Sequence, residues 1–218
     1  MSDFIMSEID PATLAELLRE AMREGKLPFL TVVSNSMSPL IRRGDQIRLA
    51  PTSAEQLQPG DIIVYLGPAN LITHRYWGRL LEKGETWLVT RGDRPQHFDR
   101  PFTSGSLVGQ VIGRRRKQHV LNLASGVGKW LNNQLANLAR LEIRLFSAPL
   151  ALSTASQVYQ LPVDKVKIAA PPAGGGPLSR SSNGILTRLI RRFLYSWAII
   201  LTVIISVIAL AFSKDIED

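Results

Sequence analysis

Residues 27–39 read LPFLTVVSNSMSP, and the interpretation of the whole chain starts from this stretch. Leu27 to Val33 form a short apolar run rich in β-branched residues, which predicts a strand. Ser36 follows this strand at a turn, where a hydroxyl group is exposed and held in one direction. Because a serine hydroxyl is a poor nucleophile alone, a catalytic role for Ser36 requires a base within hydrogen-bond reach.

The region around this stretch has the pattern of an antiparallel β structure. Further short runs of β-branched and apolar residues predict strands at Gln46–Ala50, Ile62–Leu66, Leu71–Tyr76, Thr86–Thr90 and Leu107–Arg114. Clusters of glycine, proline, asparagine and aspartate separate these runs and predict turns. Short strands at such intervals predict a mainly β fold, either a coiled antiparallel sheet or a partly open barrel.

One histidine of the chain lies on a predicted strand. This residue is His74, and an unperturbed imidazole changes its charge near neutrality, as a general base requires. Asp93 and Asp99 follow later, and either carboxylate can orient an imidazole and stabilise its charged form. With Ser36 they supply the set of groups that a serine hydrolase needs. The histidines lack metal-ligand spacing and the chain has no cysteine, so no metal or cofactor is predicted.

Several short motifs occur in a fixed order between residues 27 and 117. They are Ser34-Asn35-Ser36-Met37-Ser38-Pro39, Gly60-Asp61-Ile62-Ile63-Val64-Tyr65, His74-Arg75, Gly92-Asp93 with Asp99, and Gly109-Gln110-Val111-Ile112-Gly113-Arg114. This series resembles the signal peptidase I superfamily, specifically its serine/histidine branch, known from archaea, the endoplasmic reticulum and some Gram-positive bacteria. Arg94-Pro95 departs from that pattern, because the family usually has asparagines after its Gly-Asp motif.

The resemblance implies a serine endopeptidase with a β fold and assigns roles to individual residues. It implies Ser36 as nucleophile and His74 as general base, at the place where the bacterial branch has a lysine. It favours Asp99 as the group that orients His74, with Asp93 as a structural neighbour. Ser34 lies two residues before Ser36, on the same face of an extended strand, and is a candidate oxyanion donor.

Helical patterns flank the predicted catalytic domain of residues 27–117. Asp10-Pro11 predicts the start of an amphipathic helix within residues 1–26. From Val120 to about Phe146, leucines share one stripe and basic residues lie largely opposite, which predicts a cationic amphipathic helix within the extension 118–170. Two locations remain open for this helix: against the β domain, or at a membrane interface.

The C-terminal part predicts a membrane anchor. Residues 171–184 form a Pro/Gly/Ser-rich linker, and within residues 185–218 the segment 193–212 carries no charge. Twenty helical residues rise about 30 Å, the thickness of a hydrocarbon core. Arginines precede this segment and an acidic tail follows Lys214, so the positive-inside rule predicts a cytoplasmic catalytic domain. The resemblance implies instead an extracytoplasmic one, and this alternative stays open.

These observations predict a membrane-anchored serine endopeptidase that cleaves signal, leader or precursor peptides. The predicted partners are such a peptide and the lipid bilayer. The formal net charge is +8, but most arginines near the C-terminal end lie beside the apolar segment, which favours a membrane over nucleic acid. Two alternatives remain: a non-catalytic membrane-tethered peptide-binding module, and a self-cleaving regulator similar to repressor autopeptidases. The sequence predicts neither the natural substrate nor the oligomeric state.

Overall fold

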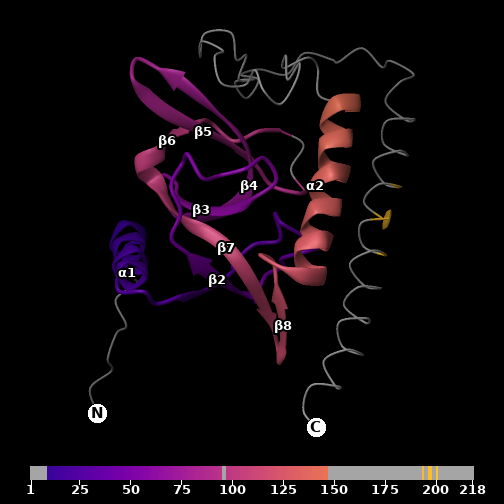
Figure 1. Cartoon of the computed structure of the whole chain (residues 1–218), viewed down its shortest axis with the longest axis horizontal. Coiled ribbons are helices and arrows are strands. Elements are labelled where there is room, and N and C mark those ends of the chain that lie inside the picture. Colours follow the sequence, from indigo (N-terminus) through magenta and orange to yellow (C-terminus); the bar gives the residue numbers. More distant parts are fainter. Residues whose placement is uncertain (1–8, 95–96, 147–192, 194–195, 198–199, 201–218) are drawn as a thin grey trace, which may run out of the picture.

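A curled antiparallel sheet forms a half-barrel with a helix on either side (Figure 1). The computed structural model describes residues 9–94, residues 97–146 and, near the C-terminus, residues 193, 196, 197 and 200. The helices are α1 (Pro11–Arg23), the 3₁₀ turn η1 (Ser104–Ser106) and α2 (Gly126–Phe146). The strands are β1 (Phe29–Thr31), β2 (Gln46–Ala50), β3 (Ile62–Leu66), β4 (Leu71–Glu82), β5 (Glu85–Arg91), β6 (Phe102–Thr103), β7 (Leu107–Arg116) and β8 (His119–Asn122).

The strand order brings segments that are distant in sequence together. Neighbouring strands follow the order β1-β2-β7-β3-β4-β5-β6. β8 lies off this path and pairs with the end of β7, where β7 also pairs with β2. Irregular registers interrupt the ladders between Arg48 and Leu49, between Val64 and Tyr65, and near Tyr76. Because such irregularities bend and twist a strand, they account for the curl of the sheet. The predicted mainly β fold is confirmed.

The predicted strand bounds needed several corrections. The first strand is limited to β1, shorter than the run 27–33, because only its middle residues pair with β2. The strand predicted at 71–76 continues to Glu82, since the whole hairpin of β4 and β5 stays paired up to Glu82 and Glu85. Neither β6 nor β8 was predicted. Both are short, and they are strands because of their pairing with β5 and β7 rather than a pattern of their own.

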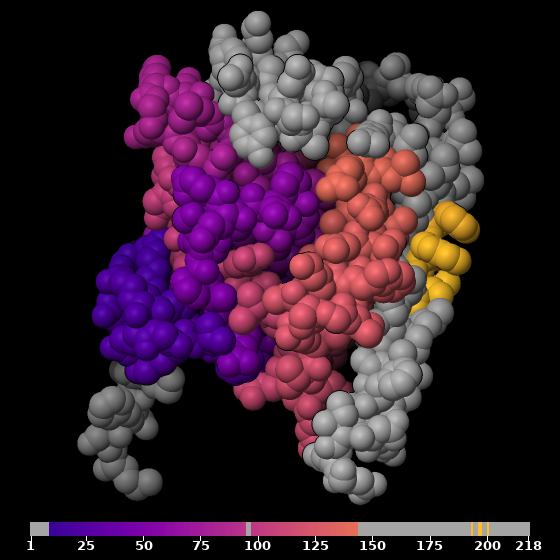
Figure 2. Space-filling view, viewed as in Figure 1, coloured from indigo at the N-terminus to yellow at the C-terminus, as the bar shows by residue number. Residues whose placement is uncertain are grey.

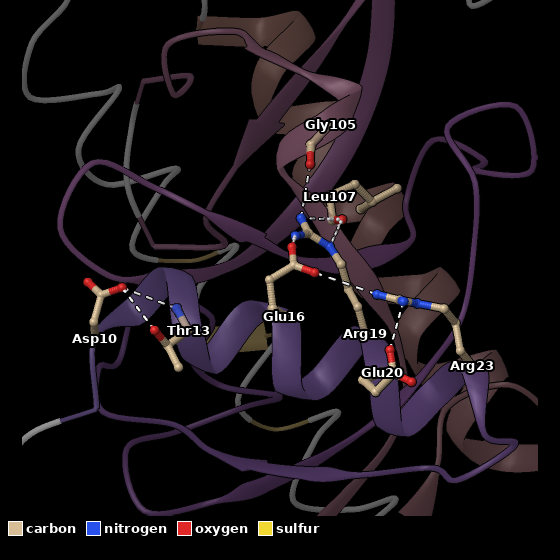
Figure 3. Close-up of polar contacts among 8 residues, drawn as sticks. All are labelled: Asp10, Thr13, Glu16, Arg19, Glu20, Arg23, Gly105 and Leu107. Carbon is tan, nitrogen blue, oxygen red and sulfur yellow. Dashed lines mark hydrogen bonds and ion pairs between the residues drawn. The ribbon is translucent and has the colours of Figure 1, made fainter.

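Helix α1 confirms the predicted N-terminal helix and is tied to the sheet by one arginine. The carboxylate of Asp10 accepts a hydrogen bond from the Thr13 backbone N–H at 3.1 Å and thereby caps the helix (Figure 3). The guanidinium of Arg19 donates to the carbonyl oxygens of Gly105, at 2.9 Å, and Leu107, at 3.0 Å (Figure 3). The apolar face of α1 is buried through Ala15, Leu18 and Met22. The helix is thus fixed on β7 by both apolar and polar contacts.

Helix α2 begins later than predicted and lies against the sheet. The prediction placed its start at Val120, but residues 119–122 pair with β7 as β8, and the helix begins at Gly126. Its buried apolar side chains include Leu131, Leu135, Ala136 and Ile143. Figures 1 and 2 show α2 on the side of the domain opposite α1. Of the two locations open for this helix, the structure therefore shows packing on the β domain.

One core runs through the β domain and both helices. It joins residues of α1, β2, β3, β7 and α2 with Met37, Leu40 and Ile41, which follow Ser36 in the chain. Thus the segments predicted as flanks on either side of residues 27–117 share the core of that region. Among the described residues, no helix is long and apolar enough to cross a membrane. The predicted linker 171–184, and all but four positions of the predicted anchor 193–212, lie outside the described residues.

Candidate active site

His74 of β4 contacts Asp99, which lies in the loop between β5 and β6. The Nδ1 atom of His74 lies 2.6 Å from Oδ2 of Asp99, and the side chains are 11% and 22% exposed, respectively. An ionised carboxylate only accepts hydrogen bonds, so Nδ1 carries the proton and the neutral ring keeps a lone pair on Nε2. His74 itself is fixed on β4, where it pairs with Ile63 of β3. This arrangement leaves Nε2 as the atom that can accept a proton.

Thr90 holds the same carboxylate from the end of β5. Its hydroxyl donates to Oδ2 of Asp99 at 2.7 Å, and its carbonyl accepts the Asp99 backbone N–H at 2.9 Å. Thr90 is fully buried, and the phenol oxygen of Tyr65 lies 3.5 Å from its hydroxyl. Burial raises the pKa of Tyr65 well above its ordinary value. The Thr90 hydrogen bond lowers it in part, and the nearby Asp99 charge adds to the rise, so the phenol stays protonated.

The other aspartate has a different partner. Both carboxylate oxygens of Asp93 lie 2.8 Å from the guanidinium of Arg75, which is 0% exposed. Bidentate pairs of this kind combine two charge-assisted hydrogen bonds in a fixed geometry. The structure therefore places Asp99 on His74 and Asp93 on Arg75.

Ser36 lies in the short segment after β1, with its neighbours fixed. Met37, the next residue, is only 1% exposed, whereas Ser36 is half-buried and Ser34 and Asn35 are exposed. The side chain of Asn35 accepts the Arg43 backbone N–H at 3.0 Å, which closes this turn. Because Met37 is packed in the core, it restricts the position of the preceding residue, Ser36.

The two serine hydroxyls lie next to one another. The Oγ atoms of Ser34 and Ser36 are 3.1 Å apart, and the Ser36 backbone N–H points toward the Ser34 oxygen at 3.5 Å. Two potential donors, a hydroxyl and a backbone N–H, thus stand beside the nucleophile candidate. This is the kind of pair that can stabilise an oxyanion formed at an attacked carbonyl group.

A chain of contacts connects the segment of Ser36 with His74. The Arg94 backbone N–H donates to the Ser36 carbonyl oxygen at 2.9 Å. Arg94 directly follows Asp93, and Asp93 pairs with Arg75, the residue next to His74 in β4. The structure therefore brings His74 and Asp99 into direct contact, whereas it connects Ser36 to them only through Arg94, Asp93 and Arg75. Of the remaining histidines, His97 is exposed in the loop before Asp99, and His119 is exposed on β8.

The sequence interpretation missed Thr90 as a residue of the site. Thr90 was predicted only as the end of a strand, because its contact to Asp99, nine positions later in the chain, depends on the tertiary fold. A threonine on a strand with an aspartate nine positions later is not a pattern that predicts a contact between the two side chains. Within the described parts of the chain, no group of three or more metal-ligating side chains comes together.

Comparison with known protein families finds no family model that matches this chain, and a search of characterised proteins finds no significant match. The geometry of the site is thus the basis for any statement about its chemistry.

Proposed function

We propose that this protein is a serine endopeptidase in which Ser36 is the nucleophile, His74 the general base and Asp99 the group that orients His74. The observation that carries the proposal is the 2.6 Å contact between His74 Nδ1 and Asp99. It fixes the imidazole with Nε2 free and places a negative charge where an imidazolium would form. The hydrogen bond from Arg94 to Ser36 supports it further, because it ties the serine segment to the same loop.

The proposed reaction is an acyl transfer to Ser36 followed by hydrolysis. Nε2 of His74 takes the Ser36 hydroxyl proton while Oγ attacks the carbonyl carbon of the peptide bond. The Ser34 hydroxyl and the Ser36 N–H stabilise the resulting oxyanion. As the C–N bond breaks, His74 returns the proton to the leaving amine. A water molecule, deprotonated by His74, then cleaves the acyl-enzyme and regenerates Ser36.

The proposed substrate is an extended signal, leader or precursor peptide. β1 is an end strand of the sheet, pairing with β2 in the described structure, and it leads directly to Ser34 and Ser36. An extended peptide can add to such an edge by main-chain hydrogen bonds, with alternate side chains entering pockets. The resemblance to signal peptidases supports this substrate class and implies small residues near the cut.

The proposed location is the membrane, with the catalytic domain on the cytoplasmic side. The uncharged segment 193–212 supports a single C-terminal membrane helix, and the arginines before it support the cytoplasmic orientation. The signal-peptidase resemblance favours the opposite, extracytoplasmic orientation.

The test is peptide cleavage by the full chain in detergent. The panel is the wild type, Ser36→Ala, His74→Ala and, as matched control, Ser53→Ala, which removes an exposed hydroxyl from another loop. Turnover of a peptide library should vanish in the first two variants and persist in the control, while all four keep the wild-type circular dichroism. Undiminished cleavage by Ser36→Ala would refute the proposal. Appearance of two fragments of the chain itself, without cleavage of added peptides, would instead favour a self-cleaving regulator.

A further inference from the structure

The hairpin strands β4 and β5 carry different groups on their two faces. Arg75 pairs directly with Arg91 across the strands, and Tyr76 pairs with Thr90. Successive side chains of a strand point to opposite faces. Therefore His74 and Thr90 share one face, and the two arginines share the other. The candidate catalytic groups thus have a pair of buried arginines directly behind them.

Asn132 of α2 contacts the first of these arginines. Its side-chain oxygen accepts a hydrogen bond from Arg75 Nη1 at 2.7 Å, and the same Nη1 donates to the Gly60 carbonyl oxygen at 2.7 Å. The other guanidinium edge of Arg75 is occupied by Asp93. Arg75 is 0% exposed and Asn132 is 8% exposed, so water has little access to this network. Asn132 therefore completes the set of partners that keeps Arg75, and through it Asp93, in place.

Glu142 contacts the second arginine from the same helix. Its carboxylate lies 2.7 Å from Arg91 Nη2, and Arg91 is 3% exposed. Arg91 is the last residue of β5 and comes directly after Thr90, which holds Asp99. Two polar residues of α2, separated by almost three helical turns, thus hold both members of the arginine pair.

The helix has little freedom to shift on the sheet. A Cβ atom on Gly60 would lie 3.2 Å from the Ala136 Cβ atom, and one on Gly128 would lie 1.9 Å from the Asn122 carbonyl oxygen. Gly60, in the turn before β3, therefore lets the middle of α2 approach closely. Gly128, near the start of α2, lets the helix approach β8. This close packing means that the positions of Asn132 and Glu142 are well defined relative to the strands.

We propose that α2 is the positioning element of the active site. Asn132, acting through Arg75, and Glu142, acting through Arg91, hold His74, Thr90 and Asp99 in the reactive arrangement. The inference rests on the proposed peptidase function and extends it. Displacement of α2 lowers activity from the far side of the sheet.

The experiment compares three substitutions in the full chain. Asn132→Leu removes the hydrogen-bond acceptor at similar size, and Asn132→Asp restores an acceptor oxygen at the same place. Asn133→Leu is the matched control, because Asn133 is the next residue of α2 and is exposed. Peptide cleavage is measured well below the unfolding temperature of each variant. The spectra of His74 are recorded in parallel by NMR with labelled histidine, which is readable because the chain has only three histidines.

The expected result separates positioning from mere stability. Asn132→Leu should lower kcat about tenfold with KM nearly unchanged, since small misplacements of catalytic groups reduce rate rather than binding. Asn132→Asp should restore most of the rate, and Asn133→Leu should match the wild type. The His74 resonances should shift in Asn132→Leu and return in Asn132→Asp.

Two outcomes overturn the inference, and each is distinct from failure of the proposed function. If Asn132→Leu lowers only the unfolding temperature and leaves kcat and the His74 resonances unchanged, α2 is a packing element alone. If Asn132→Asp behaves like Asn132→Leu, the acceptor oxygen is not the group that acts. Should the wild type cleave no peptide, the proposed function fails, and the His74 resonances alone then decide whether α2 positions this cluster.

Discussion

A double substitution at Asp99 and Thr90 tests how the imidazole is oriented. One oxygen of Asp99 accepts both from His74 Nδ1, at 2.6 Å, and from the Thr90 hydroxyl, at 2.7 Å. In Asp99→Asn an amide oxygen in the same place can accept both bonds, and this orientation is favoured because the other acceptor near the Thr90 hydroxyl, the Tyr65 oxygen, lies 3.5 Å away. The imidazole then keeps its proton on Nδ1, and only the negative charge is lost.

The expected magnitudes follow from these contacts. A hydrogen bond to a charged group contributes about 1.5–3 kcal/mol and a neutral one about 0.5–1.5 kcal/mol. The difference of roughly 1.4 kcal/mol predicts about a tenfold lower kcat for Asp99→Asn. Thr90→Val removes one donor from a carboxylate that still holds His74, and should also cost about tenfold or less. With both changes the amide is free to turn and donate to Nδ1, which leaves Nε2 protonated and unable to act as a base.

The double variant should therefore lose far more activity than the two single variants predict. A protein with the wrong imidazole tautomer loses about 10⁴-fold in kcat, against roughly 100-fold for the product of the single effects. The assay is kcat on one fluorogenic peptide for the wild type, both single variants and the double variant. Thr86→Val, on the same strand, is the control. If the double variant loses only the product of the single effects, the account of Thr90 as the group that fixes the Asp99 oxygen is refuted.

Three further predictions concern the second aspartate, the response to pH and the membrane topology. Asp93→Asn breaks an ion pair in which Arg75 is 0% and Asp93 9% exposed. It should lower the free energy of unfolding, measured in urea, by about 3 kcal/mol. The folded variant should keep a kcat closer to that of the wild type than Asp99→Asn does. A stable but inactive Asp93→Asn together with a nearly normal Asp99→Asn would reverse the two roles. Burial raises the pKa of Asp61 above its ordinary value. Above the folded-state pKa, the charged Asp61 carboxylate therefore lowers the free energy of unfolding. This destabilisation disappears as the pH falls below the unfolded-state pKa. Asp61→Asn should thus raise Tm slightly at pH 7 and leave it unchanged near pH 3, and an equal Tm change at both pH values would contradict this origin. For topology, a tag at the N-terminus should be protected from protease in intact spheroplasts, because the arginines before the uncharged segment 193–212 favour the cytoplasmic side; digestion of that tag would place Ser36 outside.

Local patterns predicted the elements whose ends are marked in the sequence. β2 and β3 have the predicted bounds, because Gly44-Asp45 and Gly60-Asp61 form turns directly before them. The capped start of α1 was predicted for the same reason. By contrast, β8 has no strand pattern that separates it from the following helix, and its conformation depends on pairing with β7. Short edge elements of this kind are set by tertiary contacts, which a local pattern does not contain.

The candidate site shows the same division between local and distant information. The order of the motifs identified Ser36, His74 and the two aspartates as candidates, since each motif is a continuous stretch. Thr90 and Asn132 were not found, because their roles arise from contacts across 9 and 57 residues of sequence, respectively. Both are buried polar residues, and buried polar groups require partners. The sequence shows that such residues exist but not which partners the fold supplies.

The different partners of the two aspartates explain why only one of them is suited to the proposed reaction. Asp93 faces a permanent cation, so its charge is balanced at every stage, and its carboxylate is fully used by Arg75. Asp99 faces an imidazole that gains a positive charge only when it takes the Ser36 proton. The charge of Asp99 is therefore compensated more strongly during the reaction than before it, which is the condition for lowering a barrier. By holding Asp93 on the opposite face, Arg75 and Asn132 also keep a second carboxylate from competing for His74.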